Sequence, residues 1–136
     1  MNEAGYSGTP LIKKLGIKPE MKILLLHPPA NYLQLLQLDL KKQFAIANKS
    51  VDFIHLFAKD TAVFKKEMKI VLKLCRMNTA AIVWVSWYKK SSGIKSGLSE
   101  NIIRDFALQH DLVDIKVCAV NVEWSGLKLI VPLAMR

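Results

Sequence analysis

The sequence predicts a single α/β domain built as a three-layer sandwich, with a mostly parallel sheet that ends in a C-terminal antiparallel hairpin. Short apolar runs alternate three times with helical patterns, and the last two apolar runs follow each other without a helix between them. Such alternation is typical of a parallel sheet with right-handed crossovers and helices on both faces. Hydrophobic residues make up 51% of the 136 residues, which is enough for one core without disulfides or a metal. We expect this domain over residues 21–136, preceded by an N-terminal arm over residues 1–20.

The first predicted strand covers residues 21–26, a continuous apolar run. It stops before Pro28 and Pro29, because proline has no backbone N–H to donate to a sheet ladder. We expect a short helix over residues 31–36, directly after these prolines. Strand and helix together form the first of the three repeating units.

The second unit begins with a predicted strand over residues 51–57, which a weaker strand candidate over residues 43–47 precedes. The following helix is expected to start at Asp60 or Thr61, because short polar side chains cap helix N-termini. Its apolar residues recur at helical spacing and its basic residues lie opposite them, as on most surface helices. The apolar face carries Phe64, Met68, Val71, Leu72 and Cys75, and the basic face carries Lys65, Lys66, Lys69, Lys73 and Arg76. We interpret the basic face as a solvated surface rather than a binding patch.

The third unit starts with a predicted strand over residues 80–87, which are rich in β-branched and aromatic side chains. A long loop over residues 88–98, reading YKKSSGIKSGL, follows it. Ser99 is expected to cap the next helix. The apolar positions of that helix are Ile102, Ile103, Phe106 and Ala107.

The chain is predicted to end in an antiparallel hairpin, with strands over residues 113–122 and 127–131 joined by a turn over residues 123–126. A strand pair after the last helix also ends the nucleotide-binding-like fold of many methyltransferases. This likeness concerns the fold alone and implies no reaction.

The cysteine and histidine content predicts no metal site. Cys75 and Cys118 sit among apolar neighbours, where a free cysteine behaves as a small hydrophobic residue. The three histidines are scattered and no Cys-x-x-Cys pair occurs, so no local cluster offers the ligands of a structural zinc. Residues 1–10 lack the features of a signal peptide, and every apolar run is far shorter than the roughly 20 residues that cross a bilayer. We therefore expect a cytoplasmic protein that does not span a membrane.

The net charge of +9 suggests nucleic-acid binding, because clustered cations release counterions from a phosphate backbone. Only three of the 20 basic residues are arginine, namely Arg76, Arg104 and Arg136. Lysine lacks the planar fork that contacts bases and phosphates in a bidentate manner. A lysine-rich surface also improves solubility, so we rank nucleic acid below other partners.

Three segments resemble a bacterial family of small domains of unknown function. They are GYSGTPLIKKLGIKP at residues 5–19, VSWYKKSSG at residues 85–93 and EWSGLKLI at residues 123–130. The family looks like a reduced relative of the methyltransferase-type Rossmann-like fold. The resemblance thus implies that fold, and it implies no activity, cofactor or catalytic residue. Glu20 stands where family members often have glycine, so a tight turn before the first strand is not expected here.

Ligands of open α/β sheets bind beyond the carboxyl ends of the strands, so the loops that follow the strands are the first candidates for a site. The loop after the first strand carries His27, Asn31 and Tyr32 but no glycine. A dinucleotide or S-adenosylmethionine cradle needs glycine there, so that the backbone can approach the cofactor. We interpret His27 as a polar strand-end residue with a backbone hydrogen-bond partner, with an acid or base role as the alternative. The loop after the second strand is interpreted as the helix cap at Asp60.

The loop over residues 88–98 brings cations, hydroxyl groups and glycine together just before a helix, a combination suited to anions. The candidate contacts are Lys89, Lys90, Ser91, Ser92 and Lys95, with Trp87 as an aromatic at the strand end. The spacing differs from the Gly-x-x-x-x-Gly-Lys-Ser/Thr of a P-loop, so lysine and hydroxyl would not reach a phosphate and magnesium together. A solvated surface loop has the same composition and stays open as the alternative.

The sequence leaves three functional hypotheses open. The first is a non-catalytic or regulatory domain that binds an anionic small molecule or a protein partner through the strand-end loops. The second is a reduced S-adenosylmethionine-dependent-like transferase that uses His27, Asn31 or Tyr32. The third is nonspecific nucleic-acid binding. We favour the first, because the sequence has no nucleophile elbow, no paired carboxylates at strand ends and no Cys-His arrangement.

Overall fold

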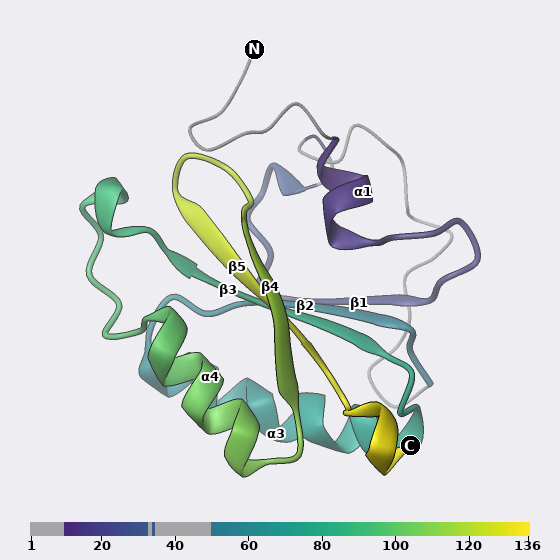
Figure 1. Cartoon of the computed structure of the whole chain (residues 1–136). Helices are drawn as coiled ribbons and strands as arrows, with labels where there is room; N and C mark the ends of the chain where they lie inside the picture. The colour runs from purple at the N-terminus through teal and green to yellow at the C-terminus, as the bar shows by residue number, and fades with distance from the viewer. Residues whose placement is uncertain (1–9, 33, 35–49) are drawn as a thin grey trace.

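The computed structural model describes residues 10–32, 34 and 50–136, which form a five-stranded sheet in the order β1-β2-β3-β5-β4 (Figure 1). Strands β1, β2 and β3 pair in parallel, and β5 is antiparallel to both β3 and β4. Four strands therefore point the same way, and the prediction of a mostly parallel sheet with a C-terminal hairpin is confirmed. The strands are β1 (Ile23–Leu26), β2 (Phe53–Phe57), β3 (Ile82–Tyr88), β4 (Val113–Ala119) and β5 (Trp124–Ile130).

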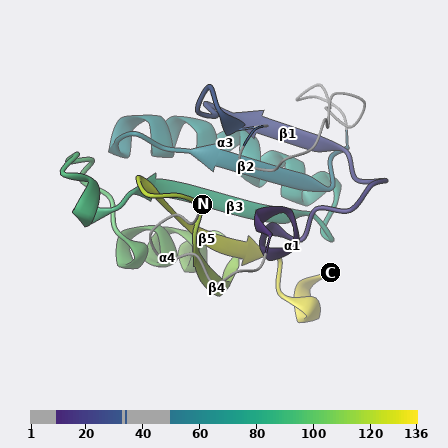
Figure 2. The same cartoon turned by 90° about the horizontal axis from the view of Figure 1, so that it is seen from above.

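Helices lie on both faces of the sheet, as the three-layer prediction requires (Figures 1 and 2). The long helices α3 (Thr61–Met77) and α4 (Glu100–Gln109) cover one face. The short helix α1 (Leu11–Leu15) lies against the other face. Within the part of the chain that the structure describes, no helix combines the length and apolar character needed to cross a membrane.

The two long helices begin where short polar side chains cap them. The Asp60 carboxylate accepts a hydrogen bond from the backbone N–H of Val63 at 2.9 Å, so Asp60 rather than Thr61 is the cap of α3. The Ser99 hydroxyl oxygen accepts from the backbone N–H of Ile102 at 3.3 Å and caps α4 as predicted. The caps therefore fix the residue at which each helix begins. The cap at Ser99 also fixes the end of the loop that precedes α4.

Two buried clusters fill the two sides of the sheet. On the side of α3 and α4, Leu56, Val85 and Trp87 belong to one buried cluster with residues of both helices. On the side of α1, Trp84 and Trp124 belong to a separate cluster. Because neighbouring side chains of a strand point to opposite faces, Trp84 and Trp87 fall in different clusters, as their spacing predicts.

Part of the predicted N-terminal arm is packed on the sheet. Leu11, Leu15 and Ile17 are buried in the cluster on the α1 side. The indole N–H of Trp84 donates to the backbone carbonyl of Leu15 at 2.8 Å. Gly16, at φ 82°, ends α1 in the left-handed conformation that glycine adopts at low cost. Residues 10–17 thus share the core of the sheet domain.

The predicted turn over residues 123–126 is wrong. The hairpin turns earlier, because the Asn121 side-chain oxygen accepts from the backbone N–H groups of Glu123 at 2.8 Å and Trp124 at 2.9 Å. Strand β4 ends at Ala119, and β5 already begins at Trp124. Gly126 lies inside β5, where an added Cβ would approach the Trp84 ring to 3.1 Å. Of the predicted helix over residues 31–36, only residues 31, 32 and 34 are described, and the weak strand candidate over 43–47 lies entirely outside the described residues.

Candidate anion-binding site at the carboxyl edge of the sheet

The carboxyl ends of β1, β2 and β3 lie at one edge of the sheet, because the three strands are parallel. The segments that follow them differ in what their side chains do. His27, directly after β1, has a left-handed backbone at φ 55°, and its Nε2 is hydrogen-bonded to the Glu67 carboxylate of α3 rather than to the expected backbone group. Asp60, after β2, is occupied as the cap of α3. The segment after β3 is left as the best candidate for ligand contacts at this edge.

The segment after β3, residues 89–97, is called the basic loop below. Its backbone begins with the short 3-10 helix η2 (Lys90–Ser92). The Ser92 hydroxyl donates to the backbone carbonyl of Lys89 at 2.7 Å and accepts from the backbone N–H of Ile94 at 3.2 Å. Gly93, at φ 77°, ends η2 in the left-handed conformation, which residues other than glycine rarely adopt. Ser92 is predicted as a ligand contact, but its hydroxyl is engaged in hydrogen bonds that shape the loop.

Two adjoining hollows share Tyr88, Lys90 and Leu98 in their walls. The helix hollow, of about 370 Å³, reaches the start of α4, and the loop hollow, of about 450 Å³, lies within the basic loop. The helix hollow is also lined by Trp87, Lys89, Ser99, Glu100, Asn101 and Ser125. The loop hollow is also lined by Gly93, Ile94, Lys95, Ser96 and Gly97. Pockets of this size suit a small molecule rather than a macromolecule.

The charge around the helix hollow is positive. Partial burial lowers the pKa of Lys89, and the nearby cation of Lys14 lowers it further. Lys90 and Lys95 are exposed at the surface of the loop. The backbone N–H of Lys89 donates to the carbonyl of Glu123 at 2.8 Å, which ties the start of the loop to the β4–β5 hairpin. An anion in the helix hollow would therefore meet ammonium groups held on an anchored segment.

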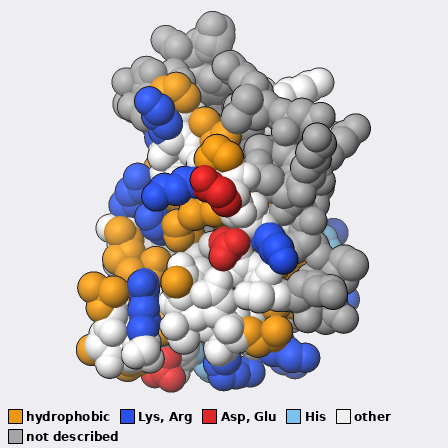
Figure 3. Space-filling model, turned by 90° about the vertical axis from the view of Figure 1, so that its right-hand side faces the viewer, with side chains coloured by type: hydrophobic (Ala, Val, Ile, Leu, Met, Phe, Trp, Pro, Cys, Tyr) orange, Lys and Arg blue, Asp and Glu red, His pale blue; other side chains and the backbone are white. Residues whose placement is uncertain are grey.

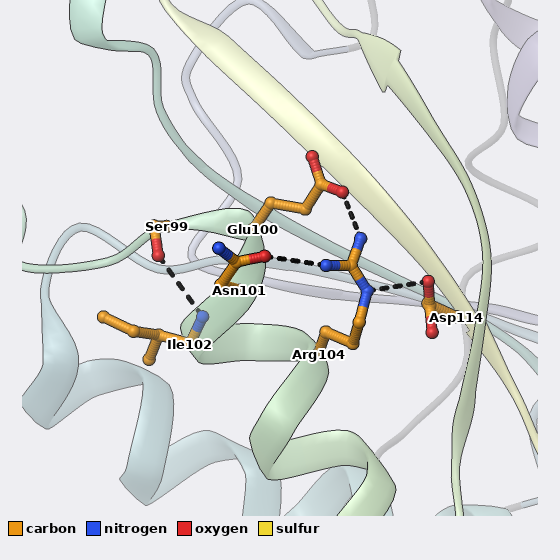
Figure 4. Close-up of polar contacts among 6 residues, drawn as sticks. All are labelled: Ser99, Glu100, Asn101, Ile102, Arg104 and Asp114. Carbon is orange, nitrogen blue, oxygen red and sulfur yellow. Dashed lines mark hydrogen bonds and ion pairs between the residues drawn. The ribbon is translucent and has the colours of Figure 1, made fainter.

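One carboxylate, that of Glu100, lines the helix hollow, and Arg104 neutralises it (Figure 4). The Arg104 guanidinium binds Glu100 and also donates to Asp114 at 2.9 Å and to Asn101 at 2.8 Å. The hydrogen bonds to Asp114 and to Glu100 raise the pKa of Arg104, so the cation persists at any physiological pH. Because Glu100 is paired with it, its negative charge opposes an incoming anion less than a lone carboxylate would.

The structure brings some predicted site residues together and separates others. Lys89, Lys90, Lys95 and Trp87 all line the two hollows, and exposed Ser91 lies in η2 between them in sequence. His27 and Asn31 follow β1, which β2 separates from β3. Two strand spacings amount to about 10 Å, so these two residues belong to a different part of the edge.

Sequence reasoning missed the contributions of Asn101 and Ser125 to the helix hollow. Asn101 belongs to the first turn of α4. Because Ser99 caps that helix and follows the basic loop, the sequence could have indicated that this turn lies next to the loop. Ser125 comes from β5, and no local pattern indicates that β5 is inserted beside β3. The described residues include no group of three His, Cys, Asp or Glu side chains that could hold a metal ion.

A buried polar chain on the α1 side was also missed. The Tyr32 hydroxyl lies 3.0 Å from Nδ1 of His55, and Nε2 of His55 lies 2.7 Å from the Ser86 hydroxyl. His55 is fully buried, which lowers its pKa to about 3 and keeps the ring neutral. Burial also raises the pKa of Tyr32. The three groups satisfy one another inside the core, and we assign them a structural role.

Comparison with known proteins supports the fold. No protein-family model matches the chain, and no curated protein matches it. A solved SAM dependent methyltransferase from Aquifex aeolicus superposes with a TM-score of 0.57 at 14% identity, covering 90% of this chain and 88% of that one. The structure of LepI in complex with SAM superposes with a TM-score of 0.52 at 11% identity, covering 97% of this chain and 48% of that one. At such low identity the likeness shows a methyltransferase-like Rossmann fold, as predicted, and nothing of activity.

Proposed function

We propose that this domain binds a small anionic molecule in the helix and loop hollows and acts as a binding module rather than an enzyme. The observation that carries the proposal is the convergence of Lys89, Lys90 and Lys95 on two adjoining hollows at the carboxyl edge of the sheet. This edge is where open α/β sheets bind their ligands. Glycine at Gly93 and internal hydrogen bonds from Ser92 hold the loop in shape before any ligand arrives.

The side chains around the hollows favour recognition over catalysis. Ser96 and Ser99 each accept a hydrogen bond from a backbone N–H of their own segment, and within the described residues no hydrogen bond joins either hydroxyl to a base that could activate it. Glu100 is held by Arg104. Among the described lining residues, the other charged groups are lysines. An anion can be bound and oriented by this set, which offers no acid and base in partnership.

Simultaneous replacement of Lys89 and Lys90 by alanine tests the proposal. Inorganic phosphate, sulfate and adenosine monophosphate serve as probes in a thermal-shift and amide NMR titration of the full chain. A bound probe at about a hundredfold its Kd adds about 2.7 kcal/mol to stability, and the double variant should lose that gain. Lys65→Ala with Lys66→Ala removes the same charge from the exposed face of α3 and should leave binding intact. Equal affinity in both double variants would end the proposal.

A second candidate, an S-adenosylmethionine-dependent-like transferase, is favoured by the fold likeness alone. The residues after β1 do not fit the usual cradle. The hydrogen bond with Glu67 fixes His27, and Pro28 and Pro29 supply no backbone donors. We derive no transfer step from them. S-adenosylmethionine belongs in the same thermal-shift screen, and stabilisation by it but by none of the anions would favour this candidate over the binding module.

Nucleic-acid binding has less support. On the face opposite the basic loop, the described side chains mix Lys and Arg with acidic and hydrophobic residues and form no continuous basic surface among themselves (Figure 3). Phosphate-backbone binding would show as an affinity that falls steeply between low and moderate salt. We expect electrophoretic mobility-shift assays with duplex and single-stranded DNA to show no such salt-dependent complex.

A further inference from the structure

A third hollow, of about 180 Å³, lies at the amino edge of the sheet, opposite the basic loop. It forms where the end of α3, the α4–β4 connection and the C-terminal residues of the chain meet (Figure 1). We call it the amino-edge hollow. Its walls share no residue with the helix or loop hollow, so a ligand here would bind independently of the proposed anion.

The floor of the amino-edge hollow is apolar. Leu72 and Cys75 reach it from α3, Leu112 from the α4–β4 connection and Val131 from the segment directly after β5. Cys75, Leu112 and Val131 are buried, and burial raises the pKa of the Cys75 thiol to about 11, so that the group stays uncharged. A floor of this kind takes up an aliphatic group of a few carbons and removes it from water.

Two opposite charges border the same hollow. Arg76 comes from the last turn of α3 and Asp111 from the connection after α4, and both side chains are exposed. Neither side chain forms an ion pair or hydrogen bond with another residue in the described part of the chain. Their charges are thus available to groups on a ligand that enters between them.

Asp111 lies just past the C-terminal end of α4. Its backbone is left-handed at φ 64°, while the backbone N–H groups of His110 and Leu112 both donate to the Ala107 carbonyl at the end of α4. The C-terminal end of a helix carries a partial negative charge, so a carboxylate next to it is unfavourable and a cation there is favourable. A positively charged ligand group beside Asp111 would offset both charges.

We propose that the amino-edge hollow binds an aliphatic α-amino acid. The guanidinium of Arg76 matches the carboxylate of such a ligand, Asp111 matches its ammonium group, and the apolar floor takes its side chain. The carboxylate of a simple fatty acid would pair with Arg76 but would be repelled by Asp111. The ammonium group of a simple amine would pair with Asp111 but would be repelled by Arg76. A zwitterion with an apolar side chain satisfies both residues at once.

The test is an amide NMR titration of the full chain with L-leucine, with isocaproate, isoamylamine and glycine as comparators. Isocaproate lacks the ammonium group, isoamylamine lacks the carboxylate and glycine lacks the side chain. We expect L-leucine to shift the amides of residues 72–79 and 110–112, and each comparator to bind at least about tenfold more weakly. No saturable shift at the solubility limit of L-leucine, or equal binding by isocaproate, would overturn the proposal.

Three variants assign the contacts. Arg76→Gln and Asp111→Asn should each weaken L-leucine binding at least about tenfold, because each loses a charge-assisted hydrogen bond. Asparagine keeps the left-handed backbone of residue 111 accessible, so the second variant leaves the fold intact. Lys73→Gln removes a cation of the same helix that does not line the hollow, so this variant should bind L-leucine as the parent does. Unchanged affinity in the Arg76 and Asp111 variants would contradict the assignment even if L-leucine binds.

Discussion

The indole N–H of Trp84, in the middle of β3, donates to the backbone carbonyl of Leu15, the last residue of α1, at 2.8 Å. Both residues are fully buried. The carbonyl at the end of a short helix has no partner within the helix, so Trp84 supplies the hydrogen bond that the backbone lacks. This contact joins the N-terminal segment to the sheet and makes α1 the third layer of the sandwich.

Trp84→Phe should lower the free energy of unfolding by about 1 to 3 kcal/mol, because the Leu15 carbonyl stays buried and loses its donor. Urea unfolding followed by far-ultraviolet circular dichroism measures the change. Trp124→Phe is the matched control, since it shrinks another buried ring that has no indole hydrogen bond among the described residues. An equal loss in both variants would show that ring volume, rather than the hydrogen bond, stabilises this face.

Gly126→Ala should destabilise the fold by about 1 to 3 kcal/mol through overpacking. A Cβ at this position would lie 3.1 Å from the Trp84 ring and 3.3 Å from the Ser86 hydroxyl, both of which are fully buried. The control is Gly93→Ala, where no atom lies within 4 Å and the cost comes from the backbone at φ 77° alone. Thermal unfolding should show a larger drop in Tm for the Gly126 variant than for the Gly93 variant. An equal drop in both would show that the steric contact does not dominate.

The strands and caps could be predicted from the sequence because their signals are local. Two prolines stop β1, and the side chains of Asp60 and Ser99 cap the helices that follow them. The hairpin turn was misplaced because serine and glycine at positions 125 and 126 are typical of turns. In the structure Gly126 is needed inside β5, where the Trp84 ring crosses the strand. That requirement depends on β5 lying beside β3, which no local pattern reveals.

The candidate site was predictable in part for the same reason. The basic loop is one continuous segment, and the parallel strands place it at the edge where ligands bind. The amino-edge hollow is lined by residues of α3, of the α4–β4 connection and of the segment after β5, so only the fold brings Arg76 and Asp111 to the same hollow. His55 likewise lies in an apolar run, and only the fold places Tyr32 and Ser86 beside its two ring nitrogens.

Stability should fall between pH 7 and pH 5 because of His55. Burial lowers its pKa to about 3 in the folded chain, whereas an unfolded histidine takes up a proton near pH 6.5. Between these values the unfolded state binds the extra proton, so the stabilisation is complete above about pH 6.5 and is lost as the pH falls. The free energy of unfolding should drop by roughly 2 kcal/mol from pH 7 to pH 5 on account of this residue.

His55→Gln checks this dependence, since glutamine can hydrogen-bond to Tyr32 and Ser86 but does not titrate. The variant should be less stable than the parent at pH 7, and its stability should change less between pH 7 and pH 5. Urea unfolding at both pH values gives the comparison. His110→Gln alters an exposed histidine and should keep the slope of the parent. A slope unchanged in the His55 variant would assign the pH dependence to other groups.

Arg104 controls how strongly the helix hollow attracts an anion, because it pairs with the carboxylate of Glu100 at the wall of that hollow. Arg104→Gln should therefore weaken inorganic phosphate binding, by between about twofold and tenfold at low salt, since an uncompensated negative charge then faces the ligand. Glu100→Gln in the same chain removes that charge and should restore the affinity. Isothermal titration calorimetry on the parent, the single variant and the double variant measures the effect. Recovery in the double variant separates this electrostatic role from a loss of α4 structure, because both variants equally lack the hydrogen bonds from Arg104 to Asp114 and Asn101.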